Sequence, residues 1–65
     1  MRDIKKLRRN LGLTQHELSR MTRVPRWRIC FFETDRINLT EAELDRIKLV
    51  LDRRLRTIIA NIAAA

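Results

Sequence analysis

The chain has 65 residues, close to the lower limit at which one hydrophobic core holds a domain together without disulfides, metal or a partner subunit. Its 15 lysine and arginine residues against 8 aspartate and glutamate residues give a net charge of +7, which favours a polyanionic partner. One cysteine excludes an internal disulfide, one cysteine with one histidine excludes a structural zinc site, and no apolar run approaches the roughly 20 residues that cross a membrane.

The first predicted helix extends from about Arg2 to Leu11. Ile4, Leu7 and Leu11 recur at three- and four-residue spacing, which places them on one face, and basic residues surround them. Gly12 follows as a typical signal for a helix C-terminus.

A strong start signal for a second helix lies at Thr14. In a capping box, the hydroxyl of Thr14 and the carboxylate of Glu17 each accept a backbone N–H of the other residue. Leu13 and Leu18 stand at the positions of a hydrophobic staple. β-Branched residues and a proline follow, so we expect this helix to end near Met21.

The third predicted helix covers residues 25–33. At 100° per residue, Ile29 and Phe32 share the face that packs against the body. The opposite face carries Trp27, Cys30, Phe31 and Thr34. An aromatic pair on the side opposite the core needs an explanation.

The fourth predicted helix follows a loop at residues 35–38, and residues 39–44 repeat the cap and staple pattern. One apolar stripe then continues without glycine or proline: Leu44, Ile47, Leu51, Leu55, Ile58 and Ile62. We expect a helix of about 20 residues or longer. The alternative is a break near Asp52 and Arg53, with a fifth helix folded back on its own subunit.

Two short helices across a tight turn form a helix-turn-helix, whose second helix lies in the major groove of DNA. The sequence resembles the Cro/phage-repressor-like (Xre-type) family in Leu13-Thr14-Gln15-His16-Glu17-Leu18-Ser19, Arg23-Val24-Pro25, Ile29-Cys30 and Glu33. The resemblance covers roughly residues 4–51. We therefore expect an all-α domain of the lambda-repressor-like type, with four to five helices and a long C-terminal helix.

The domain boundary is predicted at residue 51, with a helix-turn-helix DNA-binding domain at 1–51 and a helical extension at 52–65. The apolar residues of the extension lie beyond the part that three short helices can cover. Because a small chain seldom leaves such a stripe exposed, we expect a dimer interface formed by Leu55, Ile58, Ile59 and Ile62.

The sequence departs from the family pattern at both ends of the third helix. Arg23 stands where the family has glycine. Either the turn holds this residue in a left-handed conformation, at a cost of about 1–2 kcal/mol, or the turn differs. Pro25 replaces a capping serine, and Asp35 replaces a glycine.

The resemblance implies that Gln15 holds a phosphate and that Arg26, Trp27 and Phe31 face the bases. The guanidinium of Arg26 matches the acceptors of guanine, and the two rings can contact thymine methyl groups or sugar edges. The alternative for the rings is burial in the core.

Further arginines have predicted roles. Arg23 and Arg28 are expected to contact phosphate. The resemblance also implies an ion pair between Arg8 and Glu33 that ties the first helix to the end of the third. A surface ion pair contributes only about 0–1 kcal/mol, so we expect little stability from it.

These features predict a sequence-specific regulator that binds double-stranded DNA, a repressor of phage or bacterial type acting as a cytoplasmic homodimer on an inverted repeat. The alternative is a protein-interaction module, such as an antitoxin or anti-repressor, on the same scaffold. A membrane-surface helix is disfavoured because such helices are continuous. We expect no enzyme activity, cofactor, metal or small-molecule ligand, because no nucleophile–base set or phosphate-binding glycine loop is present.

Overall fold

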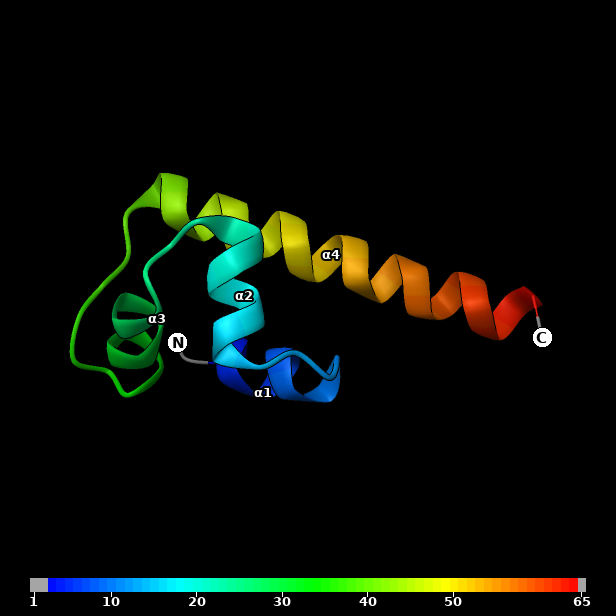
Figure 1. Cartoon of the computed structure of the whole chain (residues 1–65), viewed down its shortest axis with the longest axis horizontal. Helices are drawn as coiled ribbons and strands as arrows, with labels where there is room; N and C mark the ends of the chain where they lie inside the picture. The colour runs from blue at the N-terminus through cyan, green and yellow to red at the C-terminus, as the bar shows by residue number, and fades with distance from the viewer. Residues whose placement is uncertain (1–2, 65) are drawn as a thin grey trace.

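The computed structural model describes residues 3–64, and within this range it contains four helices and no strand (Figure 1). The helices are α1 (Asp3–Asn10), α2 (Gln15–Thr22), α3 (Arg26–Glu33) and α4 (Glu41–Ala64). The first three gather around the beginning of α4, and the remainder of α4 projects from this body (Figure 1).

The predicted all-helical fold with a long C-terminal helix is confirmed. The helix boundaries lie within one or two residues of those expected, although Arg2, the predicted start of the first helix, lies outside the described residues. Within residues 3–64, every helix is too short or too polar to span a bilayer.

Local sequence sets the helix ends. Thr14 Oγ1 accepts the N–H of Glu17 at 3.0 Å, and the Glu17 carboxylate accepts the N–H of Thr14 at 3.0 Å, so the predicted capping box is present. Thr40 and Glu43 make the same exchange at the start of α4, at 3.2 and 2.9 Å. After α1, Gly12 adopts φ 74, a left-handed conformation that glycine reaches without a steric cost.

The hydrophobic core lies where α2, α3 and the beginning of α4 meet. Leu18, Val24, Ile29 and Ile47 are fully buried there. The other buried apolar residues are Ile4, Leu11, Leu13, Phe32, Leu39 and Leu51. The hydroxyl of Ser19 donates to the carbonyl of Val24 at 2.7 Å. This bond closes the turn between α2 and α3.

α4 is one helix of 24 residues, about 36 Å long at 1.5 Å per residue. The alternative of a break near Asp52 is therefore wrong. Leu51 is the last buried residue of α4. We call residues 52–64 the α4 extension, which is about 20 Å long. Arg54 Nε donates to the carbonyl oxygen of Leu11 at 3.1 Å, which ties the base of the extension to the end of α1.

The turn between α2 and α3 holds Arg23 at φ 61 and ψ 20, in the left-handed region. Glycine at this position removes the close approach of Cβ to the backbone, so Arg23→Gly should stabilise the fold by about 1 kcal/mol. Urea unfolding followed by circular dichroism measures the change. As a control, Arg20→Gly in the interior of α2 should cost about 1 kcal/mol. A midpoint for Arg23→Gly at or below that of the wild type would contradict strain at this turn.

Candidate nucleic-acid interface

α3 presents two aromatic side chains on the face turned away from the core. Ile29 and Phe32 are buried against the body, whereas Trp27 is 56% exposed and Phe31 is half-buried. The two aromatic rings pack edge to face, with centroids 5.8 Å apart and planes at 78°. Burial of Trp27 in the core, the alternative that the sequence left open, is therefore wrong, and Phe31 is not part of the buried core.

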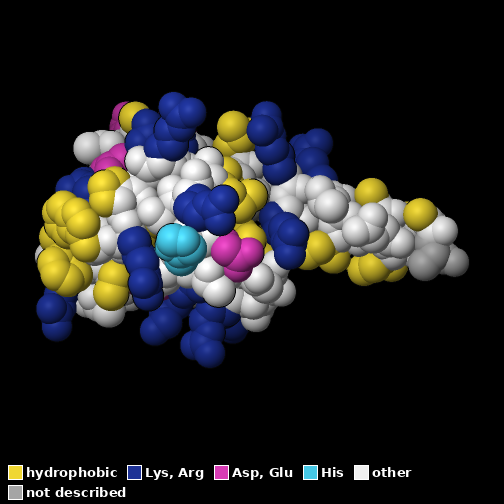
Figure 2. All heavy atoms as spheres, in the orientation of Figure 1, with side chains coloured by type: hydrophobic (Ala, Val, Ile, Leu, Met, Phe, Trp, Pro, Cys, Tyr) yellow, Lys and Arg dark blue, Asp and Glu magenta, His cyan; other side chains and the backbone are white. Residues whose placement is uncertain are grey.

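Arginine side chains border this aromatic pair. The guanidinium carbon of Arg28 lies 5.6 Å from the centroid of the Trp27 ring, and that of Arg36 lies 5.5 Å from the Phe31 ring. Figure 2 shows apolar side chains gathered at the end of the molecule where α3 lies, with lysine and arginine side chains around them. We call the outward side of α3 that carries Arg26, Trp27 and Phe31 the α3 outer face.

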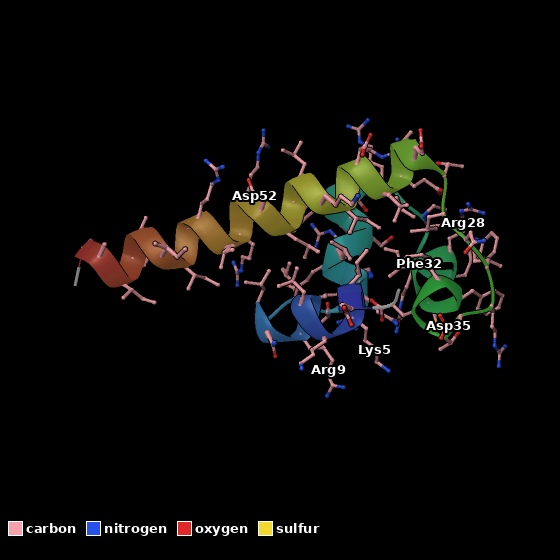
Figure 3. The ribbon with its side chains drawn as sticks, turned by 180° about the vertical axis from the view of Figure 1, so that it is seen from behind. Lys5, Arg9, Arg28, Phe32, Asp35 and Asp52 are labelled. Carbon is pink, nitrogen blue, oxygen red and sulfur yellow. The ribbon has the colours of Figure 1, made fainter. Side chains whose placement is uncertain are left out.

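A basic hollow lies beside the α3 outer face, where the end of α1 and the starts of α2 and α3 converge. Its volume is about 500 Å³, and its lining residues are Arg8, Arg9, Gly12, Leu13, Thr14, Gln15, His16 and Arg26. The first N–H groups of α2 have no acceptor within the helix, and the helix dipole favours an anion at this end. Arg9 projects from α1 away from the body (Figure 3). A phosphate group suits the charge and the donors of this hollow.

Gln15, the predicted phosphate contact, opens α2 and is half-buried. Its side-chain Nε2 donates to Glu33 Oε1 at 2.9 Å. The side-chain amide is thus directed toward the end of α3, and the backbone N–H of Gln15, at the first position of α2, has no acceptor within the helix. A phosphate contact by this residue would use the main chain first.

The ion pair between Arg8 and Glu33 joins α1 to the last residue of α3. Arg8 Nε and Nη2 donate to the two carboxylate oxygens at 2.8 and 2.9 Å, and Nη1 donates to the carbonyl of Leu13 at 2.7 Å. The expectation of a surface pair is wrong, because the two side chains are only 7% and 1% exposed. Burial opposes the charged form of Glu33, but hydrogen bonds from Arg8 and Gln15 outweigh it and hold the pKa of this carboxyl below its usual range.

Arg28, a predicted phosphate contact, is paired with a carboxylate in the structure. Its Nε and Nη2 donate to the two carboxylate oxygens of Glu43, each at 2.7 Å. Since Glu43 also caps α4, this pair fastens α3 to the first turn of α4, and Arg28 lies near that end of α4 in Figure 3. Arg28 thus links two helices instead of standing free. Hydrogen bonds from Arg28 and from the backbone N–H of Thr40 lower the pKa of Glu43 to about 2.

The two lowered carboxyl pKa values predict loss of stability in acid. A carboxylate whose pKa is lower in the folded than in the unfolded protein, where it is about 4.3, stabilises the fold above that value and loses the contribution as the pH falls toward the folded pKa. For Glu43 this window extends from about pH 5 to about pH 2. Melting temperatures followed by circular dichroism should therefore fall steadily across this range. Glu43→Gln should show a shallower decrease, and equal melting temperatures at both ends of the range would contradict the prediction.

Arg23, a predicted phosphate contact, is exposed, and so are three of the four residues of the predicted dimer interface. Leu55, Ile59 and Ile62 of the α4 extension are 42–71% exposed, with Ile58 half-buried beside them. An apolar groove of about 350 Å³ between α1 and α4 adjoins this stripe, lined by Asp3, Ile4, Leu7, Lys48, Leu51, Asp52 and Leu55. The last eight described residues carry no charge. The extension thus exposes a continuous apolar surface on an otherwise highly charged chain.

The sequence pattern assigns no site role to Arg9, Arg36 or Glu43. Arg9 reaches the hollow only because the turn after α1 brings the end of α1 beside the start of α2. Glu43 carries a recognisable capping signal, but its partner Arg28 lies 15 residues away. No local pattern marks Arg36 as a neighbour of Phe31.

Comparison with curated proteins and with solved structures finds no significant match. A family model does match: the helix-turn-helix model HTH_3 covers residues 4–58. This range contains every residue of the basic hollow and of the α3 outer face. It confirms the resemblance read from the motif. The chain belongs to the HTH_3 family of Xre-like helix-turn-helix proteins, which are DNA-binding regulators.

Proposed function

We propose that this helix-turn-helix protein is a sequence-specific transcriptional repressor of phage or bacterial type, which binds an inverted-repeat operator in double-stranded DNA as a homodimer in the cytoplasm. The observation that carries the proposal is the position of the α3 outer face directly beside the basic hollow. α3 is held from behind by Ile29 and Phe32, so its outer face is free to enter a major groove while the hollow meets the adjacent phosphates.

Base readout is assigned to the α3 outer face. Arg26, exposed at the first position of α3, suits bidentate binding to guanine O6 and N7. Trp27 and Phe31 supply apolar contacts at neighbouring base pairs. Arg26 and Trp27 are neighbours in the first turn of α3 and Phe31 lies about one turn later, so the three side chains can contact bases within one half-site.

Phosphate binding is assigned to groups at the hollow and to Arg23. Arg9 and Gln15, which opens α2, line the hollow, and Arg23 is exposed in the turn at the other end of α2. Arg28 is left out of this set because Glu43 holds its guanidinium. The contribution of Arg28 is to hold α3 in place.

The dimer interface is assigned to the α4 extension, which corresponds to the helical extension predicted from the sequence at residues 52–65. Leu55, Ile58, Ile59 and Ile62 form its apolar side, and Leu7 continues the same surface onto the body. In a dimer with two-fold symmetry, the two α3 helices enter successive major grooves about 34 Å apart. A bound dimer represses by occluding RNA polymerase.

Selection of duplexes from a random pool, followed by titration at several salt concentrations, tests the proposal. We expect a palindromic sequence to be enriched. The logarithm of the association constant for this duplex should fall linearly with the logarithm of the salt concentration. The slope should be about −0.9 for each neutralised phosphate, and we expect about six to ten of these. Arg26→Ala should relax the preference at one base position, whereas Arg9→Ala should weaken all duplexes alike and reduce the slope. No enriched sequence and a slope near zero would count against DNA binding at this surface.

The exposed aromatic pair also favours a second candidate, a protein-interaction module such as an antitoxin or anti-repressor, because aromatic residues are enriched in protein interfaces. In that case a protein partner contacts the α3 outer face. Its affinity would change little with salt, and no DNA sequence would be enriched. The same two measurements therefore separate the candidates.

A further inference from the structure

The α3 outer face has few groups that can form hydrogen bonds with base edges. Within α3, which the structure describes completely, the side chains that can form hydrogen bonds are those of two arginines, a cysteine, a glutamate and Trp27, whose indole offers one N–H donor. Glu33 is bound by Arg8, and Arg28 is bound by Glu43. Arg26 is the remaining arginine, so hydrogen bonding from α3 can specify only a short part of a half-site.

Apolar contact must therefore carry much of the readout. At 100° per residue, Trp27 and Phe31 lie within about 30° of the direction opposite the buried face of α3. They occupy the middle of the surface that would meet DNA. The hydroxyl of Thr34, which shares this side, donates to carbonyls of its own helix, 3.0 Å from that of Cys30.

The aromatic surface is held in place on both sides. The edge-to-face packing fixes the two rings relative to each other. Arg28, itself paired with Glu43, lies over the Trp27 ring, and Arg36 lies over the Phe31 ring. A preorganised apolar surface loses little rotational freedom when it meets a small apolar group.

In the major groove, the C5-methyl group of thymine is the apolar group on a base edge, and cytosine presents one only when it is methylated at C5. We infer that Trp27 and Phe31 form a binding surface for the methyl group of a 5-methylpyrimidine, thymine or 5-methylcytosine, beside the base read by Arg26. This inference rests on the proposed DNA-binding function. Arg36, which borders the Phe31 ring, favours DNA over an apolar protein segment, because it places positive charge beside the aromatic pair.

The test uses the full chain and the duplex enriched by selection. Each thymine is replaced in turn by uracil, which keeps the hydrogen-bonding edge and lacks only the methyl group. We expect binding to weaken about fourfold when one half-site lacks the methyl group and about fifteenfold when both do. With cytosine placed at that position, methylation at C5 should strengthen binding by a similar factor.

Variants locate the methyl-binding surface. The double variant Trp27→Ala with Phe31→Ala should bind thymine and uracil duplexes equally, with an unchanged salt slope. Met21→Ala, which removes a comparably exposed apolar side chain from α2, should keep the thymine preference. Equal binding of thymine and uracil duplexes by the wild type, with a normal salt slope, would overturn the inference alone. Absence of any salt-dependent DNA binding would overturn the proposed function and the inference with it.

Discussion

Replacing Glu33 by alanine should leave the protein largely unfolded at room temperature. The change removes both acceptors of Arg8 Nε and Nη2 and leaves a guanidinium that is 7% exposed without its counter-ion. Breaking a buried ion pair in this way costs about 3–5 kcal/mol, which is comparable with the whole stability of a domain of this size. Far-ultraviolet circular dichroism should show loss of most helical signal, or a melting temperature lowered by tens of degrees.

The matched control is the exposed ion pair between Arg56 and Asp52 in the α4 extension, whose side chains are 79% and 51% exposed. Asp52→Ala should change stability by no more than about 0.5 kcal/mol. A compensated variant, Arg8→Met with Glu33→Leu, should recover much of the lost stability because it leaves no unpaired buried charge. A native-like melting curve for Glu33→Ala would show that the pair does not stabilise the fold.

Placing glutamate at both Ile59 and Ile62 should abolish the proposed dimer. These side chains are 55% and 71% exposed at the end of the α4 extension, so the free chain accepts the change without disturbing its core. Two negative charges per chain would oppose each other in an apolar interface. A monomer engages one half-site at a time, and affinity for the inverted repeat should fall by about 100-fold or more. Analytical ultracentrifugation and operator titration measure the two effects.

Leu49→Glu is the control for this variant. Leu49 is 51% exposed and lies on the same helix, about 15 Å before Ile59 along the axis and about 80–180° around the axis from the apolar residues of the α4 extension. It should leave both the sedimentation coefficient and operator affinity unchanged. If Leu49→Glu and the double variant behave alike, the α4 extension is not the dimer interface.

The elements of the fold could be predicted because their signals are local. Thr14 and Thr40 with their partners three residues later marked two helix starts, and Gly12 marked a helix end. The apolar period that reached Ile62 without an interruption predicted the length of α4. The helix-turn-helix motif then placed α3 against α2, so the outward position of Trp27 followed from helical geometry.

The sequence could not show which charged side chains form ion pairs when they are far apart in the chain. Arg8 and Glu33 are 25 residues apart, and their environment depends on how closely α1 approaches α3. Arg28 could be ranked as a phosphate ligand from its place on the helix, but Glu43 reaches it only because the loop at residues 35–40 returns α4 to that side. Periodicity assigns a side chain to a face, and tertiary packing decides which charge it meets.

The pair between Arg28 and Glu43 has a consequence for the spacing of operator halves. It joins the aromatic surface of α3 to the first turn of a helix that continues without a break into the α4 extension. In the proposed dimer, each α3 outer face is therefore connected to the two-fold axis through a continuous α4 helix. No flexible linker lies between them that could let one α3 rotate relative to the other. Adding one base pair between the half-sites rotates one of them by about 35° relative to the other. Such a spacer change should be tolerated poorly, even though every contacted base is still present.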